Sequence, residues 1–338
     1  MNSAPVPHSI ARAVQSSRRW TVSLSRLPTA LALSAALGLT FAATVGCAPP
    51  MITDEAHAKE ILDHIEQTRL YIENYSRQGS HPCAEEKCVF VTFWDFDGTI
   101  IHGDITDGLT DPQSGEVEYK GLEQLSIEAG IAPRYLGEDG FARYRQDYDR
   151  LEASKGHAEA YAYIAQIFAG ARPSEFETIV DAHFAQRLTK YYFQSSIDII
   201  RRLQHNGVQT RVVSASPTFF VRGAAESLGV PPEWITGVEL EMNGEFLSDQ
   251  IKPPFNYAAG KTERIKYEVE KIKQAEQTEH VYVLAGFGNS HHTDGDFLDW
   301  IAAQKLPDGS PLSVMINGDS PEPNPAWRYV EQKQLVSE

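Results

Sequence analysis

The chain is poor in cysteine, and its first 53 residues contain no acidic side chain. Three of the 338 residues are cysteines. No internal repeat or low-complexity tract is present, which excludes a chain built from tandem repeats. Cys47 ends an N-terminal apolar run, so Cys83 and Cys88 are the only remaining pair, too few for a zinc site without other nearby ligands. The length and the 42% hydrophobic content suit one large α/β domain with an insert, or two modest domains.

The N-terminal region, residues 1–47, has the pattern of an export signal. Four arginines precede the first acidic residue, Asp54, and the uncharged run LPTALALSAALGLTFAATVGC then ends at Cys47. A basic stretch, an apolar stretch and a small-residue end predict export. The ending TVGC resembles a bacterial lipobox, which implies that Cys47 is lipidated at the periplasmic face of a membrane. The alternatives are an uncleaved anchor, since about 20 apolar residues span a bilayer, and secretion after cleavage.

The rest of the chain carries an excess of negative charge. Residues 1–46 hold four of the 30 basic residues and none of the 46 acidic ones, so 26 basic residues remain and the formal charge is −20. Such a surface argues against nucleic acid and against an anionic membrane surface as partners. We therefore expect membrane contact only through the N-terminal lipid or anchor.

Apolar periodicity predicts helices alternating with parallel strands. Residues 53–78 place Ile61, Ile65, Thr68, Ile72 and Tyr75 on one helical face. Apolar strands are predicted at 88–94, 210–216, 281–286 and 312–317, each of the last three preceded by a helical pattern, and a hairpin turns at Asn243-Gly244. Between 119 and 190 only helical patterns occur.

This order of elements predicts an α/β fold, a doubly wound parallel sheet with an inserted all-helical cap. The predicted division is a signal at 1–47, an N-terminal helix and loop at 48–87, a catalytic core at 88–105 and 191–338, and the cap at 106–190.

Polar residues follow the predicted strands at the edge where ligands bind to parallel sheets. The first strand ends in WDFDGT, which contains Asp95, Asp97, Gly98 and Thr99, and the second reaches Ser214. Lys261 opens the helix before the third strand, and GNSHHTD follows that strand with Asn289 and Asp294. Carboxylates, a hydroxyl, an amide and an ammonium group therefore converge on one edge.

These four motifs, in this order over about residues 88–318, resemble those of the haloacid dehalogenase (HAD) superfamily. The resemblance implies a Rossmann-like core in which Asp95 is the nucleophile and Asp97 the general acid and base. It implies phosphate binding by Gly98, Thr99, Ser214 and Lys261. It also implies Mg²⁺ held by Asp95, Asp97, Asn289 and Asp294. Asn289 replaces the first aspartate of the fourth motif, so we expect weaker Mg²⁺ binding.

The helical insert and the segment VVSASPTFFVRGAAESLGV are similar to the phosphoserine-phosphatase branch of that superfamily. There, an acid nine residues after the nucleophile contacts the substrate amine, and Asp104 occupies this position. Arg143 and Arg145 are further candidate substrate residues, and Tyr161 and Tyr163 are candidates for a cage around a quaternary amine. Surface or core packing is the alternative for these arginines and tyrosines.

The predicted function is a Mg²⁺-dependent phosphomonoesterase that forms an aspartyl-phosphate and acts on a small phosphorylated metabolite outside the cytoplasm. The alternatives are a phosphotransferase or mutase of the same family and a non-catalytic binding lipoprotein that kept the fold. Export makes a disulfide between Cys83 and Cys88 an expectation, with two free thiols as the alternative. His291-His292 is expected to face solvent rather than to bind zinc.

Overall fold

A computed structural model describes residues 54–75, 83, 86–307, 311–318 and 323–336. All of these lie within one compact unit, Cys47–Glu338, so the predicted domain boundaries stay a prediction. The export signal and Cys47 lie outside the described residues. Within these ranges, no helix combines the length and the apolar content needed to cross a bilayer.

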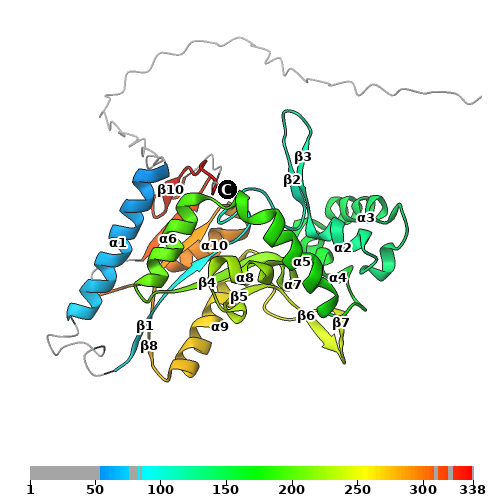
Figure 1. The fold of residues 1–338 in the computed structure, drawn as a ribbon. Coiled ribbons are helices and arrows are strands. Elements are labelled where there is room, and N and C mark those ends of the chain that lie inside the picture. The colour runs from blue at the N-terminus through cyan, green and yellow to red at the C-terminus, as the bar shows by residue number, and fades with distance from the viewer. Residues whose placement is uncertain (1–53, 76–82, 84–85, 308–310, 319–322, 337–338) are drawn as a thin grey trace, which may run out of the picture. The chain divides into compact units, whose positions relative to one another are not determined.

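The centre of the fold is a six-stranded parallel sheet (Figure 1). Its strand order is β10-β9-β8-β1-β4-β5, with β1 paired to β8 on one side and to β4 on the other. The strands are β1 Cys88–Trp94, β4 Gln209–Pro217, β5 Ile235–Val238, β8 His280–Gly288, β9 Leu312–Ile316 and β10 Arg328–Val330. The predicted doubly wound sheet is confirmed, and β5 and β10 are additional to the four predicted strands.

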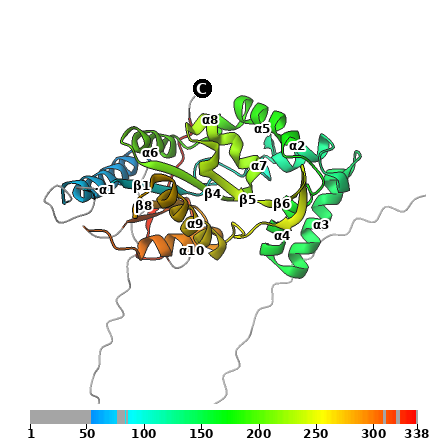
Figure 2. The same cartoon turned by 90° about the horizontal axis from the view of Figure 1, so that it is seen from below.

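Helices cover both faces of this sheet, as Figure 2 shows. α1 Asp54–Tyr75 and α6 Gln194–His205 lie on one face, and α9 Ala259–Glu276 and α10 His291–Ala302 on the other. Strand β1 serves both layers because successive side chains point to opposite faces. Val91 and Phe93 pack with the α9–α10 layer, whereas Phe90 and Trp94 belong to the core on the other face.

The N-terminal helix α1 packs on α6 through the face that the sequence predicted. Ile61, Ile65 and Ile72 are fully buried, and Thr68 is nearly so. The Asn206 side chain after α6 adds a hydrogen bond to Glu66 at 3.2 Å. Just before β1, a disulfide joins Cys83 to Cys88, with their Cα atoms 5.4 Å apart.

The insert between β1 and β4 is mainly helical but contains two strands that the sequence did not predict. Its helices are α2 Leu122–Glu128, α3 Gly140–Lys155, α4 His157–Gln166 and α5 Ser174–Gln186. Strands β2 Gly108–Thr110 and β3 Val117–Lys120 form an antiparallel hairpin before α2. These strands are too short, and β3 too exposed, to show a periodic apolar pattern.

The predicted hairpin at Asn243-Gly244 is present as β6 Leu240–Asn243 and β7 Phe246–Ile251. Although it follows β5 in the chain, it lies beside α4 of the insert (Figure 2). The Gly170 N–H donates to the Leu247 carbonyl, and the Leu247 N–H donates to the Ala171 carbonyl, both at 2.8 Å. The hairpin is therefore hydrogen-bonded to the insert.

An aromatic cluster connects the insert to the sheet. It joins Phe168 and Phe176 of the insert to Phe219 and Phe220 of α7 Thr218–Val221, which follows β4. The Phe176 and Phe219 rings are stacked 4.3 Å apart. The remaining short elements are α8 Ala225–Leu228 and the 3-10 helices Pro133–Tyr135, Leu188–Tyr191, Arg222–Ala224 and Pro232–Trp234.

Candidate active site

A cavity of about 540 Å³ lies between the ends of β1, β4 and β8 and the insert. Of the predicted site residues, six line it: Asp95, Asp97, Gly98, Asp104, Lys261 and Asn289. It is also lined by residues that the sequence did not single out, among them His102, Asp107, Ser216, Ser290 and Thr293. Tyr161 of α4, one of the two tyrosines predicted as a possible cage around an amine, lines it as well.

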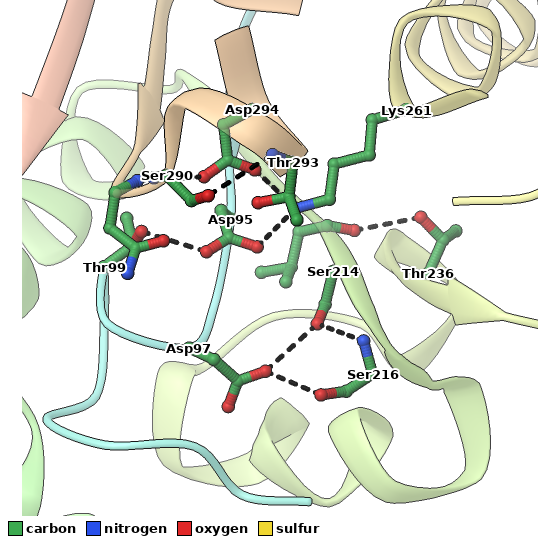
Figure 3. A network of polar contacts seen from close by, with 12 residues as sticks. Asp95, Asp97, Thr99, Ser214, Ser216, Thr236, Lys261, Ser290, Thr293 and Asp294 are labelled. Atoms are coloured by element: carbon green, nitrogen blue, oxygen red, sulfur yellow. Dashed lines mark hydrogen bonds and ion pairs between the residues drawn. The ribbon is translucent and has the colours of Figure 1, made fainter. Parts of the chain in front are cut away.

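Asp95 follows β1 and is held firmly (Figure 3). Its N–H donates to the Phe287 carbonyl at 2.8 Å, which continues the pairing with β8. One carboxylate oxygen accepts a hydrogen bond from Lys261 Nζ at 2.6 Å, and the other accepts one from Thr99 Oγ1 at 3.0 Å. Burial and the nearby Asp294 raise the pKa of Asp95 to about 7, against the opposing effect of Lys261.

Asp294 lies behind Lys261 rather than at the cavity. Lys261 is fully buried and also donates to Asp294 Oδ1 at 2.6 Å. Asp294 Oδ2 accepts hydrogen bonds from the N–H groups of Asn289 and Ser290 at 2.9 and 3.0 Å. In this structure both Asp294 oxygens position Lys261 and the loop after β8, and direct metal binding by Asp294 stays a prediction.

Asp97 has the environment of a proton donor and acceptor. Its Oδ1 accepts the Ile105 N–H at 2.8 Å, and its Oδ2 accepts hydroxyl hydrogen bonds from Ser216 at 2.6 Å and Ser214 at 3.3 Å. Burial and the Asp95 charge raise the pKa of Asp97 to about 6, although the Ser216 and Ile105 donors oppose this. A carboxyl with a pKa near neutrality is suited to general acid and base catalysis.

Among the cavity residues that the sequence did not single out, Ser216 contacts Asp97 directly. It lines the cavity, and its hydroxyl also accepts a hydrogen bond from Thr106 Oγ1 at 2.9 Å. Ser214, the predicted phosphate-binding serine, is fully buried behind it and accepts the Ser216 N–H at 2.9 Å. Side chains two residues apart on a strand share a face. The sequence SAS, residues 214–216, could therefore have predicted Ser216 together with Ser214.

The structure gives Gly98 and Thr99 contacts within the protein, and their role in phosphate binding stays a prediction. Gly98 has φ +69°, and a Cβ there would overlap the Asn289 side chain, so glycine is required. Its N–H donates to the Gly103 carbonyl at 3.0 Å. Thr99 is fully buried with its hydroxyl on Asp95, so it orients the carboxylate.

The oxygen atoms around the cavity suit a hard divalent cation. No group of three histidine, cysteine or acidic side chains in the described part of the chain has the arrangement to hold a metal. The family resemblance implies the Asp95 carboxylate, the Asp97 backbone carbonyl and the Asn289 amide as the metal donors, and all three residues line the cavity. No described residue hydrogen-bonds to the Asn289 side chain, so its carbonyl oxygen is available. Such oxygen donors are those that Mg²⁺ prefers, although they bring one negative charge fewer than two carboxylates would.

At the insert end of the cavity, two acidic residues lie near Tyr161. Asp104 Oδ1 accepts the N–H groups of Thr106 at 2.7 Å and Asp107 at 3.0 Å. Burial, with the neighbouring Asp97 and Asp107 carboxylates, holds the pKa of Asp104 well above its usual range. Asp107 forms an ion pair with Arg145 at 2.8 Å.

The other predicted substrate residues do not line the cavity. Arg143 donates to the Leu136 carbonyl at 2.6 Å and forms an ion pair with Asp139 at 3.2 Å, both within the insert, and its contact with substrate stays a prediction. Arg145 does not line the cavity, but it forms an ion pair with Asp107, which does. Tyr163 hydrogen-bonds to the Tyr135 hydroxyl, so it forms no cage with Tyr161.

The paired histidines also lie away from the cavity. The His291 ring packs 4.9 Å from Trp327, and His292 is exposed. Neither histidine lines the cavity.

Comparisons with known proteins place the chain among haloacid dehalogenase-like hydrolases, the family that matches residues 92–294. A solved protein of unknown function from Bordetella pertussis Tohama I has a similar fold, with 14% identity, coverage of 72% of this chain and 99% of that chain, and a TM-score of 0.50. A substrate-bound phosphoserine phosphatase is 13% identical over 73% of this chain and 95% of its own, with a TM-score of 0.41. Cytosolic 5′-nucleotidase IIIB bound to cytidine is 16% identical over 67% of this chain and 72% of its own, with a TM-score of 0.43. No curated protein sequence matches the chain.

Proposed function

Because the chain belongs to the haloacid dehalogenase-like hydrolase family, we propose that it is a phosphoric monoester hydrolase that works through a phosphorylated Asp95. The observation that carries this proposal is the position of Asp97 on the same cavity as Asp95, with its pKa raised to about 6. A halide leaves without a proton, whereas an alkoxide needs one. A proton donor beside the nucleophile therefore favours phosphate esters as substrates.

In the first half-reaction, an Asp95 carboxylate oxygen attacks the phosphorus atom. The bond from phosphorus to the alkoxide oxygen breaks as Asp97 gives its proton to that oxygen, and an alcohol leaves. In the second half-reaction, water gives a proton to the Asp97 carboxylate and attacks the phosphorus atom. The bond from phosphorus to the Asp95 oxygen breaks, which releases inorganic phosphate and regenerates the Asp95 carboxylate.

Positive charge is needed because the nucleophile and the substrate are both anions. Lys261 Nζ, 2.6 Å from Asp95, provides one charge within the protein. When bound by the Asp95 carboxylate, the Asp97 carbonyl and the Asn289 amide, a divalent cation such as Mg²⁺ supplies the rest and favours ionised Asp95. The serine hydroxyls of the site keep Asp97 directed toward the leaving oxygen.

The proposal is tested by phosphate release from p-nitrophenyl phosphate by the purified full-length protein, with Mg²⁺ and with EDTA. We expect release that requires Mg²⁺ and that Asp95→Asn abolishes. Asp111→Asn, which removes an acid outside the cavity, is the matched control and should retain activity. Transfer of phosphate to an added alcohol rather than to water would instead identify a phosphotransferase. Folded protein that releases no phosphate under any condition would support a binding role.

The neutral ligand Asn289 gives a separate prediction about the metal. Asn289→Asp adds a carboxylate beside Asp95, so we expect the Mg²⁺ concentration for half-maximal activity to fall about tenfold, because ligand charge tunes affinity. The same titration can be followed by thermal melting in the absence of substrate, since a ligand that binds the folded state raises the melting temperature. An unchanged Mg²⁺ dependence in both measurements would contradict this prediction.

A further inference from the structure

The two ends of the cavity differ in charge. Asp95 and Lys261 mark the end where the phosphoryl group reacts. At the other end, Asp104 and Asp107 lie on the segment that follows Asp97, and Tyr161 comes from α4. Burial and the carboxylates of Asp104 and Asp107 raise the pKa of the Tyr161 hydroxyl, and all three residues line the same cavity.

No cation of the cavity is free to balance these two acids. Among the described residues that line it, Lys261 is the only lysine or arginine, and it is fully buried between Asp95 and Asp294. Arg145 contacts Asp107 at 2.8 Å, but it is shared with the buried Glu123 at 3.3 Å. Asp104, Asp107 and Glu123 therefore face a single arginine. A cation bound beside Asp104 would offset the carboxylate repulsion that raises its pKa, and would favour its ionised form.

The acids are also held in place. The Tyr144 hydroxyl donates to Glu123 Oε2 at 2.5 Å, and Glu123 in turn contacts Arg145. Arg145, which does not itself line the cavity, thus ties Asp107 to α3. Asp104 uses only Oδ1 for its two backbone hydrogen bonds, and no described residue hydrogen-bonds to Oδ2. An oxygen atom of Asp104 therefore remains for a ligand.

From this geometry, and resting on the proposed phosphatase function, we infer the class of the substrate. The leaving group is an amino alcohol whose ammonium group binds between Asp104, Asp107 and Tyr161. An ammonium group gains charge-assisted hydrogen bonds from the carboxylates and a cation–π contact from the tyrosine ring. A carboxylate on the leaving group has no counter-ion there, so the site disfavours phosphoserine, and Asp107 is a specificity-determining residue.

The test compares kcat/KM of the full-length protein for phosphoethanolamine, phosphocholine, glycerol 3-phosphate, phosphoserine and p-nitrophenyl phosphate at fixed Mg²⁺. We expect kcat/KM for at least one of the two amino-alcohol esters to be about tenfold or more above that for glycerol 3-phosphate and for phosphoserine. Tenfold is the usual effect of a hydrogen bond to a charged group. Comparing phosphoethanolamine with phosphocholine shows whether the site takes a primary or a quaternary ammonium.

Asp107→Asn should reduce the preference for the amino-alcohol ester over glycerol 3-phosphate about tenfold, mainly through KM. Asp104→Asn, which keeps the Oδ1 acceptor for the backbone, provides a second variant with the same expectation. The matched control is Glu118→Gln, which removes an exposed acid on β3 and should leave the preference unchanged. Thermal melts establish that each variant is folded.

The outcomes separate the two proposals. Hydrolysis of p-nitrophenyl phosphate with no preference for amino-alcohol esters, or a preference that both aspartate variants retain, overturns this inference alone. A preference for phosphoserine overturns it as well. Absence of hydrolysis of every ester, p-nitrophenyl phosphate included, overturns the proposed function and this inference together.

Discussion

Two serines on β4, Ser214 and Ser216, donate to the same oxygen of Asp97, yet only Ser216 lines the cavity. Its hydrogen bond is also the shorter one, at 2.6 Å against 3.3 Å. We therefore expect Ser216 to be the main group that positions the Asp97 carboxyl. Ser214, buried behind it, stabilises the end of the strand.

Replacing Ser216 should affect substrates according to their leaving group. We expect Ser216→Ala to lower kcat about tenfold for an alkyl phosphate, the usual effect of a lost hydrogen bond to a charged group. The loss should be smaller for p-nitrophenyl phosphate, whose leaving group needs little protonation. Steady-state kinetics on both substrates measure the difference. Ser214→Ala is the matched comparison, and an equal loss on both substrates with Ser216→Ala would contradict the positioning role.

At this scale, the sequence predicts residue types better than atomic roles. The motif WDFDGT was sufficient to place Asp95 and Asp97 at a strand end. It does not reveal that the Thr99 hydroxyl bonds to Asp95, or that Asp294 is enclosed by Lys261 and two backbone N–H groups. These roles depend on side-chain rotamers and on contacts between residues far apart in the chain, which spacing does not determine.

Among the elements, long helices and buried strands were predictable and short or exposed ones were not. α1 and β1 have strong periodic or continuous apolar patterns, and the structure matches them closely. β5 and β10 have four and three residues, and the β2–β3 hairpin is partly exposed. Such segments owe their strand conformation to neighbouring elements, so local pattern gives little indication of them.

The contact between α2 and α3 contains an acid that sequence pattern does not reveal. Glu123 of α2 is fully buried and meets Tyr144 and Arg145 of α3. Burial and the nearby Asp107 raise its pKa well above the usual value, although Tyr144 and Arg145 oppose this. A carboxyl with a raised pKa in the folded state removes stability as the pH rises from its unfolded pKa through its folded pKa.

Glu123→Gln should therefore become more stabilising, relative to the wild type, as the pH rises from 5 to 8. Glutamine keeps the acceptor for Tyr144 and Arg145 but carries no charge to desolvate. Melting temperatures of both proteins across this range measure the difference, with Glu118→Gln as an exposed control that should show little trend. A difference that decreases with pH would mean that the pairing with Arg145 outweighs burial.

For the whole molecule, we propose export as a lipoprotein, because of the basic and apolar pattern of residues 1–47 and the resemblance of TVGC to a lipobox. We expect the full-length protein, expressed in a Gram-negative bacterium, to incorporate labelled palmitate and to partition into detergent. Cys47→Ala should abolish the labelling. Cys83→Ala is the matched cysteine control and should retain it. A labelled Cys47→Ala protein, or an unlabelled wild type, would contradict the proposal.

The insert is joined to the core by the two chain segments that lead to β1 and β4, and also by contacts between residues far apart in the chain. The β6–β7 hairpin, which belongs to the core in sequence, exchanges two backbone hydrogen bonds with residues 170–171, and the rings of Phe176 and Phe219 are stacked across the same junction. A hinge motion that swings the insert away would break both connections at once. We therefore expect substrate entry and alcohol release without such a motion, so the cavity of about 540 Å³ limits the size of the ester that can react.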